Sequence, residues 1–296
     1  MSTAGDSNAI SRNYLDSLLI ETRYMNSTSP STSFELFGRT FASPIMTAAL
    51  SHLDHMGAPG MAKGIAEGAR DAGCVMWYGM APDEEIDMLA GTGVQLIEII
   101  KPYADRDLIF RKIEHARSKG LLAVGIDIDH PFGSDGSPDV CDGYELRAMT
   151  TAEMTELCAF AKMPMIAKGV LSLYDADQVL QAGVAGMVLS HHNNRITYAI
   201  PPLMLLPDIL PLTAGKCDVF VDCMIQTGMD AYKALALGAK GVCIGRPLMT
   251  AFKKDPANGV REYLTHAAGE LAKAMAFTGC SDLTKTDPSV IHRAGL

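Results

Sequence analysis

The chain has 296 residues, 48% of them hydrophobic, and a formal net charge of -9. This acidic balance argues against a broad nucleic-acid-binding surface, although a local basic pocket could still hold a phosphate. The longest apolar runs, such as 186–189 and 242–244, are far shorter than the ~20 residues that a membrane-spanning helix needs. We therefore expect neither nucleic acid nor a membrane among its partners.

The start of the chain and its cysteines indicate a cellular location. Residues 1–13 are polar and show no basic end followed by an apolar block, so we expect no signal peptide. The seven cysteines are scattered and show neither a disulfide framework nor paired zinc spacing. A reducing cytoplasm fits both features best.

The first 40 residues are predicted to form an N-terminal extension. Residues 1–10 and the Ser/Thr-rich segment 26–33 have the composition of flexible chain, whereas apolar residues recur at helical spacing over 12–23. We expect this extension to form a lid over the domain that follows, residues 41–296.

Short apolar strands alternate with helical segments through the rest of the chain. Strands are predicted at 44–49, 74–77, 94–100, 121–128, 163–167, 186–190, 218–222 and 240–244. Helices are predicted at 60–72, 83–90, 106–118, 151–161, 173–182, 202–210, 229–238 and 256–277. Strict alternation predicts a single α/β domain, a closed parallel (β/α)8 TIM barrel rather than an open sheet. Barrels of ~250 residues commonly form one domain.

Polar side chains follow several of these strands, and catalytic groups of such barrels sit just beyond the carboxyl ends of strands. Lys, Asp and His are costly to bury at the end of an apolar strand unless they are paired or used. A functional site at one rim is therefore expected from Asp127, Asp129, Lys168, His191, His192, Arg195, Asp222 and Arg246.

The stretch 218–247 predicts a phosphate site. It reads as strand, helix and second strand, and it ends in Gly245-Arg246. In TIM barrels the loops after the seventh and eighth strands, together with a helix N-terminus, commonly cradle a phosphate. We expect a cofactor or substrate that carries one.

Five short runs, in order along the chain, carry a resemblance to a known family. They are Ser43-Pro44-Ile45-Met46, Ala167-Lys168-Gly169-Val170-Leu171, Ser190-His191-His192-Asn193-Asn194-Arg195, the run 233–241, and Gly245-Arg246-Pro247. With them, residues from about 41 to 293 resemble the FMN-dependent α-hydroxy acid dehydrogenase/oxidase family, the relatives of glycolate oxidase and lactate oxidase. The resemblance implies an FMN-dependent oxidoreductase that moves hydride from a hydroxy-acid-like, anionic small molecule to FMN, and a homo-oligomer.

The same resemblance assigns roles to individual residues. His192 matches the catalytic base, Asp129 the aspartate that orients it, and Arg195 the arginine that binds the substrate carboxylate. Imidazole suits proton transfer near neutral pH, and the guanidinium fork suits a carboxylate. The cofactor-binding positions implied are Lys168, Asp222, Gly245, Arg246, Ala48 and Ser190. No metal ligand is implied.

Less specific interpretations of these residues remain open. Lys168 could form a structural ion pair with Asp129 or Asp222, or act as a Schiff-base lysine. His192 could be a solvated loop histidine, and Arg195 could form a surface salt bridge. For His191, where the family usually has asparagine, the loop histidine is the favoured interpretation.

The chain departs from the family pattern around the substrate. The phosphate-loop pattern Asp-Gly-Gly-Ile-Arg appears here as Asp222-Cys223-Met224-Ile225-Gln226. The second carboxylate-binding arginine is absent from 131–136, and the substrate tyrosine has no clear counterpart in 95–103, which ends in Tyr103. Tyr14 or Tyr24 could replace the N-terminal substrate tyrosine. A replacement arginine could come from a partner subunit or from Arg12 or Arg23. Asp127 stands where a small hydroxyl residue is usual and adds negative charge. We therefore expect an altered substrate, bulkier or less anionic than glycolate or lactate.

Two other classes of function stay open on sequence grounds. One is a lyase or isomerase on the same barrel. Metal assistance is open to it, because several oxygen and nitrogen ligands share one rim. These are Asp127, Asp129, His130, His192 and Asp222. The other is a non-catalytic binding protein that kept the fold after losing substrate residues.

Overall fold

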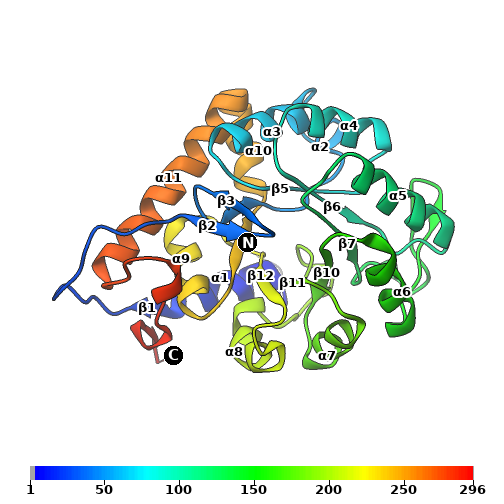
Figure 1. Ribbon diagram of the computed structural model, residues 1–296. Coiled ribbons are helices and arrows are strands. Elements are labelled where there is room, and N and C mark those ends of the chain that lie inside the picture. Colours follow the sequence, from blue (N-terminus) through cyan, green and yellow to red (C-terminus); the bar gives the residue numbers. More distant parts are fainter. Residues whose placement is uncertain (1–3, 296) are drawn as a thin grey trace.

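A barrel of eight parallel strands forms the centre of the protein in a computed structural model that describes residues 4–295 (Figure 1). The sheet order is β4-β13-β12-β11-β10-β7-β6-β5. Between the two end strands, Thr47 N donates to Val75 O at 3.1 Å and Gly79 N donates to Leu50 O at 2.9 Å, which closes the barrel. The strands are β4 (Ile45–Thr47), β5 (Met76–Gly79), β6 (Leu96–Ile100), β7 (Ala123–Asp127), β10 (Met165–Val170), β11 (Gly186–Leu189), β12 (Asp218–Val221) and β13 (Gly241–Ile244). The TIM-barrel prediction is confirmed.

A ring of helices covers the outside of the barrel (Figure 1). They are α2 (Leu53–Met56), α3 (Met61–Asp71), α4 (Asp83–Gly91), α5 (Arg106–Ser118), α6 (Thr151–Ala161), α7 (Leu173–Ala182), α8 (Pro202–Thr213), α9 (Gly228–Ala236), α10 (Arg246–Lys254) and α11 (Pro256–Phe277). The sequence prediction missed α2 and α10. Because α10 begins directly at the end of β13, it places its N-terminus at the rim that the strands also reach.

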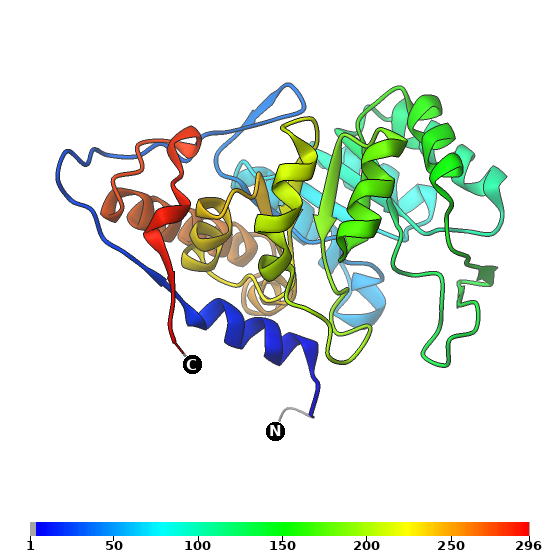
Figure 2. The same ribbon diagram turned by 90° about the horizontal axis from the view of Figure 1, so that it is seen from below.

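The interior of the barrel is closed at its amino end by a hairpin of β2 (Phe34–Leu36) and β3 (Arg39–Phe41). Phe34, Leu36 and Phe41 join a buried cluster with the interior residues Trp77 and Phe220, whose rings pack edge-on at 5.3 Å. Figure 2 shows this hairpin and helix α1 on opposite sides of the barrel. Side chains thus fill the amino end, and space for a ligand is left at the carboxyl end.

The N-terminal segment is more ordered than its composition indicates. Helix α1 (Ser7–Ser17) begins at Asp6, whose side chain accepts the Asn8 amide hydrogen. The prediction of flexible chain over 1–10 is therefore wrong from residue 7 onward, and residues 1–3 lie outside the described residues. The helix expected over 12–23 ends early, because Leu18–Ile20 forms β1 and pairs antiparallel with β14 (Ile291–Arg293). The buried side chains of α1 include three serines, so hydrogen bonds replace much of the apolar pattern that marks most helices.

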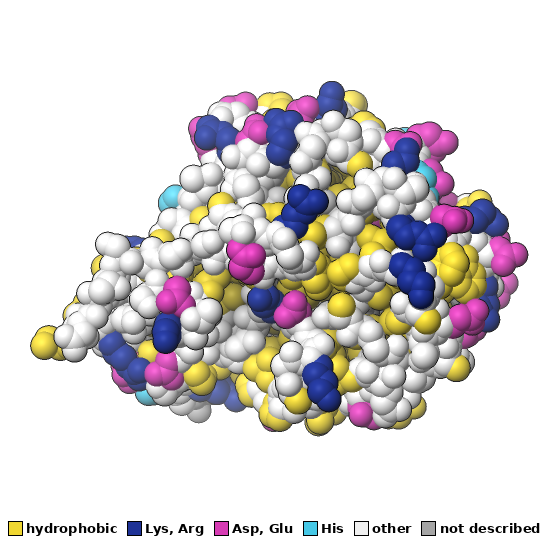
Figure 3. Space-filling model, viewed as in Figure 1, with side chains coloured by type: hydrophobic (Ala, Val, Ile, Leu, Met, Phe, Trp, Pro, Cys, Tyr) yellow, Lys and Arg dark blue, Asp and Glu magenta, His cyan; other side chains and the backbone are white. Residues whose placement is uncertain are grey.

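The remaining elements are short. A small hairpin, β8 (Val140–Cys141) and β9 (Tyr144–Glu145), lies in the loop after β7, and two 3-10 turns, η1 (Leu283–Lys285) and η2 (Pro288–Val290), precede β14. On the face in Figure 3, Lys and Arg side chains are scattered among Asp and Glu. Within residues 4–295, helices long and apolar enough to cross a membrane are absent.

Glu98 in β6 is a buried carboxyl group outside the barrel interior. Its side chain is 1% exposed, Oε1 lies 3.8 Å from Lys112 Nζ, and Oε2 has no hydrogen-bond partner within the described chain. Burial raises the pKa of Glu98 from 4.5 to about 7. The folded chain therefore holds a proton that the unfolded chain releases between these two values, and stability falls as pH rises across that window.

We expect Glu98→Gln to stabilise the protein at pH 8 by on the order of 1–3 kcal/mol, because the amide removes the cost of a buried negative charge. At pH 4.5 and below the difference should vanish. Urea unfolding of the wild type, Glu98→Gln and the exposed control Glu84→Gln at both pH values measures it. Equal effects of Glu98→Gln at pH 4.5 and pH 8 would contradict the assignment.

Candidate active site

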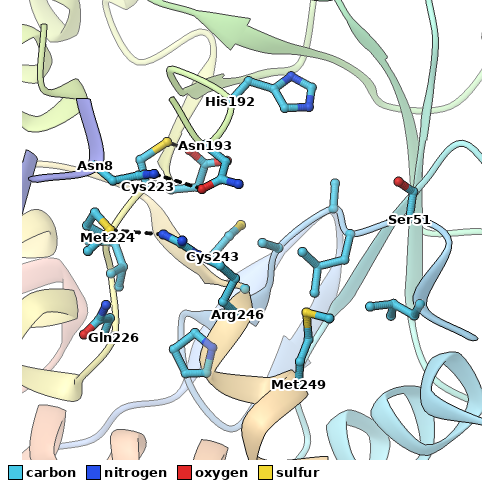
Figure 4. Close-up of a pocket in the computed structure, with 18 of the residues that line it drawn as sticks. Asn8, Ser51, His192, Asn193, Cys223, Met224, Gln226, Cys243, Arg246 and Met249 are labelled. Carbon is cyan, nitrogen blue, oxygen red and sulfur yellow. Dashed lines mark hydrogen bonds between the residues drawn. The ribbon is translucent and has the colours of Figure 1, made fainter. Parts of the chain in front are cut away.

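A cavity of about 470 Å³ opens at the carboxyl end of the barrel (Figure 4). Loops after β4, β11, β12 and β13 form its walls, and α1 adds Asn8. Six of the nine residues predicted for the site line it: Ala48, Lys168, His192, Asp222, Gly245 and Arg246. His192 therefore shares one space with five of the six predicted cofactor positions.

A buried cluster of charges lies at the ends of β6, β7 and β10. Asp127 Oδ1 accepts from Lys168 Nζ at 3.0 Å, and Asp127 Oδ2 accepts from Lys101 Nζ at 2.5 Å. Burial opposes ionisation of Asp127, but Lys168, His192 and Lys101 outweigh it and hold the pKa of this carboxyl well below its usual range. Burial likewise opposes the charge on Lys168, yet Asp127 and neighbouring acids raise the pKa of its ammonium.

Lys101 changes the interpretation of this rim. From the sequence, Asp127 was expected to repel an anion. In the structure the ammonium groups of Lys101 and Lys168 balance the charge of Asp127. Although Asp127, His130 and His192 lie close enough together to ligate a cation, the two lysines occupy positions around Asp127 that a cation would take. The metal-assisted alternative is thereby weakened. Lys168 forms an ion pair, but its partner is Asp127 rather than Asp129 or Asp222, the partners expected from the sequence.

His192 and Asp129 form a hydrogen-bonded pair beside this cluster. His192 Nδ1 lies 2.8 Å from Asp129 Oδ1, so Nδ1 carries the hydrogen and Nε2 remains an acceptor. Burial and the charge of Asp127 raise the pKa of Asp129. Gly169 makes the arrangement possible, because a Cβ there would lie 2.2 Å from Asp129 Cγ and its φ is +94°.

Arg195 does not reach the cavity lining in this arrangement. Its Nη2 donates to Phe132 O and, at 3.1 Å, to Asp139 Oδ2. The same Asp139 oxygen accepts from His130 Nε2 at 2.9 Å, while Lys101 Nζ donates to His130 Nδ1 at 2.5 Å. Burial and the charges of Lys101 and Arg195 lower the pKa of His130 to about 4, so this ring is neutral at pH 7. In this structure Arg195 therefore forms a salt bridge with Asp139, as one of the two interpretations predicted.

Two loops at the cavity hold residues other than glycine in the left-handed conformation. In the loop after β11, φ is +50° at His192, +56° at Asn193 and +68° at Asn194. In the loop after β12, φ is +65° at Cys223 and +66° at Met224, where the family pattern has two glycines. Asparagine tolerates this region, but a residue such as Met224 is strained by on the order of 1–3 kcal/mol. Cys223 and Met224 thus keep the left-handed backbone conformation that glycine would adopt without strain.

The part of the cavity predicted to hold a phosphate lies between these loops and α10. Helix α10 begins at Gly245 without a capping side chain, and Arg246 Nη2 lies 3.4 Å from Met224 Sδ (Figure 4). Ala48 N donates to Ile244 O at 2.7 Å, which fixes the facing loop. Asp222 Oδ1 accepts from Cys223 Sγ at 2.8 Å. Pro247 has no N–H and the Leu248 amide donates to Gly245 O at 2.9 Å, so this helix start offers the amide and the guanidinium of Arg246 to a phosphate group.

The other predicted residues support the site from behind or lie elsewhere. Ser190 Oγ accepts from His192 N at 3.0 Å and so anchors the histidine loop. Tyr24 packs against Phe277 at 5.7 Å, and Tyr14 lies under Arg293 at 5.2 Å, so neither tyrosine lines the cavity. The expectation that one of them replaces the substrate tyrosine is wrong for this arrangement.

Comparisons with known proteins agree with this geometry. Residues 2–155 and 136–293 match the family described as FMN-dependent dehydrogenase. The 4-hydroxymandelate oxidase of Amycolatopsis orientalis is 27% identical over 294 residues, which cover 86% of this chain and 81% of the relative. Glycolate oxidase of Spinacia oleracea is 25% identical over 293 residues, covering 86% and 79%. A solved mandelate oxidase mutant with a C4a-OH-FMN adduct aligns with a TM-score of 0.87 and 26% identity, covering 100% of this chain and 93% of that one.

Proposed function

Because this chain belongs to the FMN-dependent dehydrogenase family, we propose that His192, held by Asp129, is the base with which it oxidises a hydroxy acid. Its cofactor is FMN, and it is an oxidoreductase of the α-hydroxy acid oxidase type. The observation that carries the proposal for His192 is its position: its side chain lines the same cavity as Lys168 and the start of α10.

The cavity residues fit FMN at both of its ends. Arg246, through its guanidinium and its amide beside Gly245, would hold the phosphate, whereas Lys168 offers a buried cation to the ring system. Ala48, Asp222 and the backbone of the loop after β12 would form the walls between them, with Ser190 behind. Bound FMN supplies the acceptor for the substrate hydride.

His192 would take the substrate hydroxyl proton at Nε2. Asp129 fixes the tautomer that leaves this nitrogen free and stabilises the imidazolium that forms. Gly169 lets Asp129 approach closely enough to do so. Lys168, paired with Asp127, remains charged and can balance negative charge that develops in the cavity.

The substrate is proposed to be an anionic hydroxy acid bulkier than glycolate or lactate. Of the two arginines that bind the substrate carboxylate in the family, the chain keeps Arg195. Its Nη2 already donates to Asp139 Oδ2 at 3.1 Å. A substrate carboxylate must displace Asp139, so a single charge-assisted contact, worth ~1.5–3 kcal/mol, is partly cancelled. Remote parts of a larger substrate would supply the missing binding energy.

Anaerobic flavin reduction tests this substrate class. We expect mandelate-sized hydroxy acids to bleach the flavin at concentrations at least about tenfold below those of lactate and glycolate, since tenfold corresponds to ~1.4 kcal/mol of binding. Asp139→Asn should lower the half-saturating concentration of lactate by releasing Arg195. Rapid bleaching by lactate or glycolate at sub-millimolar concentration would show that the ordinary substrates of the family are used.

Location and assembly remain proposals of the same kind. A cytoplasmic location is supported by seven cysteines that are all free. A homo-oligomer is supported by exposed apolar side chains such as Phe132, Val140 and Ile196.

A further inference from the structure

Helix α1 bonds to the loop that carries His192. Ser7 N donates to Asn194 Oδ1 at 2.8 Å, and Asn8 Nδ2 donates to Asn193 Oδ1 at 3.1 Å (Figure 4). Ser11 Oγ lies 2.9 Å from His191 Nε2. Three residues spaced along one side of the helix thus reach residues on both sides of His192 in the chain.

The His191 ring connects Ser11 of α1 to the backbone of the loop after β11. The amide of Asn194 donates to His191 Nδ1 at 3.1 Å, so Nε2 carries the ring hydrogen and donates to Ser11. The ring is buried, and burial lowers the pKa of His191, which keeps it in this neutral form. A histidine that the sequence analysis favoured as a loop residue therefore links α1 to the left-handed turn.

The same helix bonds to the loop at the phosphate end. Arg12 donates to both Asp230 oxygens at 2.8 and 2.9 Å and to Met224 O at 3.1 Å. Asp230 Oδ2 also accepts the amide hydrogens of Gln226 and Thr227 at 3.1 Å. Arg12 and Asp230 together fix the chain immediately after the left-handed pair Cys223-Met224.

We propose that α1 is a positioning element that clamps both left-handed loops, with Ser11 acting through His191 on His192 and Arg12 acting on the phosphate loop. A strained backbone persists only where surrounding contacts over-determine it. Here one helix supplies such contacts on two sides of the cavity. The assigned roles rest on the proposed function, since they place His192 and the FMN phosphate in this cavity.

Arg12→Met tests the phosphate side, with Arg23→Met as its matched control. Arg23 also lies in the N-terminal segment and also pairs with two acids, Glu21 and Asp287, but touches neither loop. In the FMN-free protein, hydrogen exchange of amides 223–227 should accelerate at least about tenfold in Arg12→Met alone. FMN affinity, measured by flavin fluorescence quenching, should fall by a similar factor.

Ser11→Ala tests the contact between α1 and the loop that carries His192, because it removes the hydrogen bond to His191. Ser11→Thr restores the hydroxyl group, and Ser27→Ala is the control. Ser27 Oγ donates to Ala276 O, away from the cavity. Ser11→Ala should lower kcat by about fivefold, the worth of one neutral hydrogen bond, while KM and FMN affinity stay unchanged and Ser11→Thr recovers activity.

The outcomes separate the clamp from the proposed function. Unchanged exchange rates in Arg12→Met and unchanged kcat in Ser11→Ala, in a wild type that binds FMN, would overturn the clamp and leave the function standing. A wild type that neither binds FMN nor oxidises hydroxy acids would overturn the function, whereas the exchange comparison in FMN-free protein would still decide whether α1 holds the loops.

Discussion

Replacing His192 by Gln is expected to slow anaerobic flavin reduction by ~10²–10⁴-fold, the usual worth of a general base, while FMN stays bound. Glutamine keeps a similar size and can bond to Asp129, but it cannot take up a proton at neutral pH. The hydroxyl proton of the substrate then has no acceptor at the position of Nε2. Stopped-flow bleaching at saturating substrate measures this step directly.

Two companion variants make the result specific. Asp129→Asn should also slow the step, because the amide no longer selects the tautomer with a free Nε2 or stabilises an imidazolium. His266→Gln changes an exposed histidine on α11 and should leave the rate unchanged. A His192→Gln enzyme that reduces its flavin at the wild-type rate would remove His192 from the mechanism.

The barrel and the position of its site follow from sequence patterns of short range. Most of the buried strands are short, largely apolar runs, and most of the predicted polar residues stand at or just beyond the end of such a run. Lys168, His192, Asp222 and Arg246 reach the same cavity because all parallel strands end at one rim. Strand order was enough to place these residues together.

The ion pair between Lys101 and Asp127 was not predicted, although strand pairing indicates it. In the sheet Ile100 pairs with Ile126, so the next residues, Lys101 and Asp127, lie side by side at the ends of neighbouring strands. The pairing of consecutive strands in a TIM barrel would have placed a cation beside Asp127. Treating Asp127 alone led to the expectation of an uncompensated negative charge, which the structure corrects.

The left-handed loops and their clamp had no comparable signal. Cys223 and Met224 adopt a conformation that sequence reasoning reserves for glycine, and the contacts that hold them come from Arg12, more than two hundred residues away in the chain. Arg195 is a similar case, because its partner Asp139 lies in an irregular loop. Long-range polar contacts of loops leave no periodic trace in a sequence.

Arg246→Ala is expected to weaken FMN binding by about ten- to a hundredfold, because it removes one charge-assisted phosphate contact worth ~1.5–3 kcal/mol. The effect should be large in this chain, since Gln226 stands where the family pattern has a second arginine and only backbone amides remain beside Arg246. Titration of FMN-free protein with FMN, followed by fluorescence quenching, gives the affinity.

Riboflavin and Gln226→Arg provide the controls. Riboflavin lacks the phosphate, so its affinity should be the same in the wild type and in Arg246→Ala. Gln226 also lines the cavity (Figure 4), and Gln226→Arg should strengthen FMN binding and recover part of the loss in the double variant. If Arg246→Ala weakened riboflavin as much as FMN, the guanidinium would be supporting the cavity wall through Met224 rather than binding phosphate, and the phosphate would have to be held by backbone amides alone.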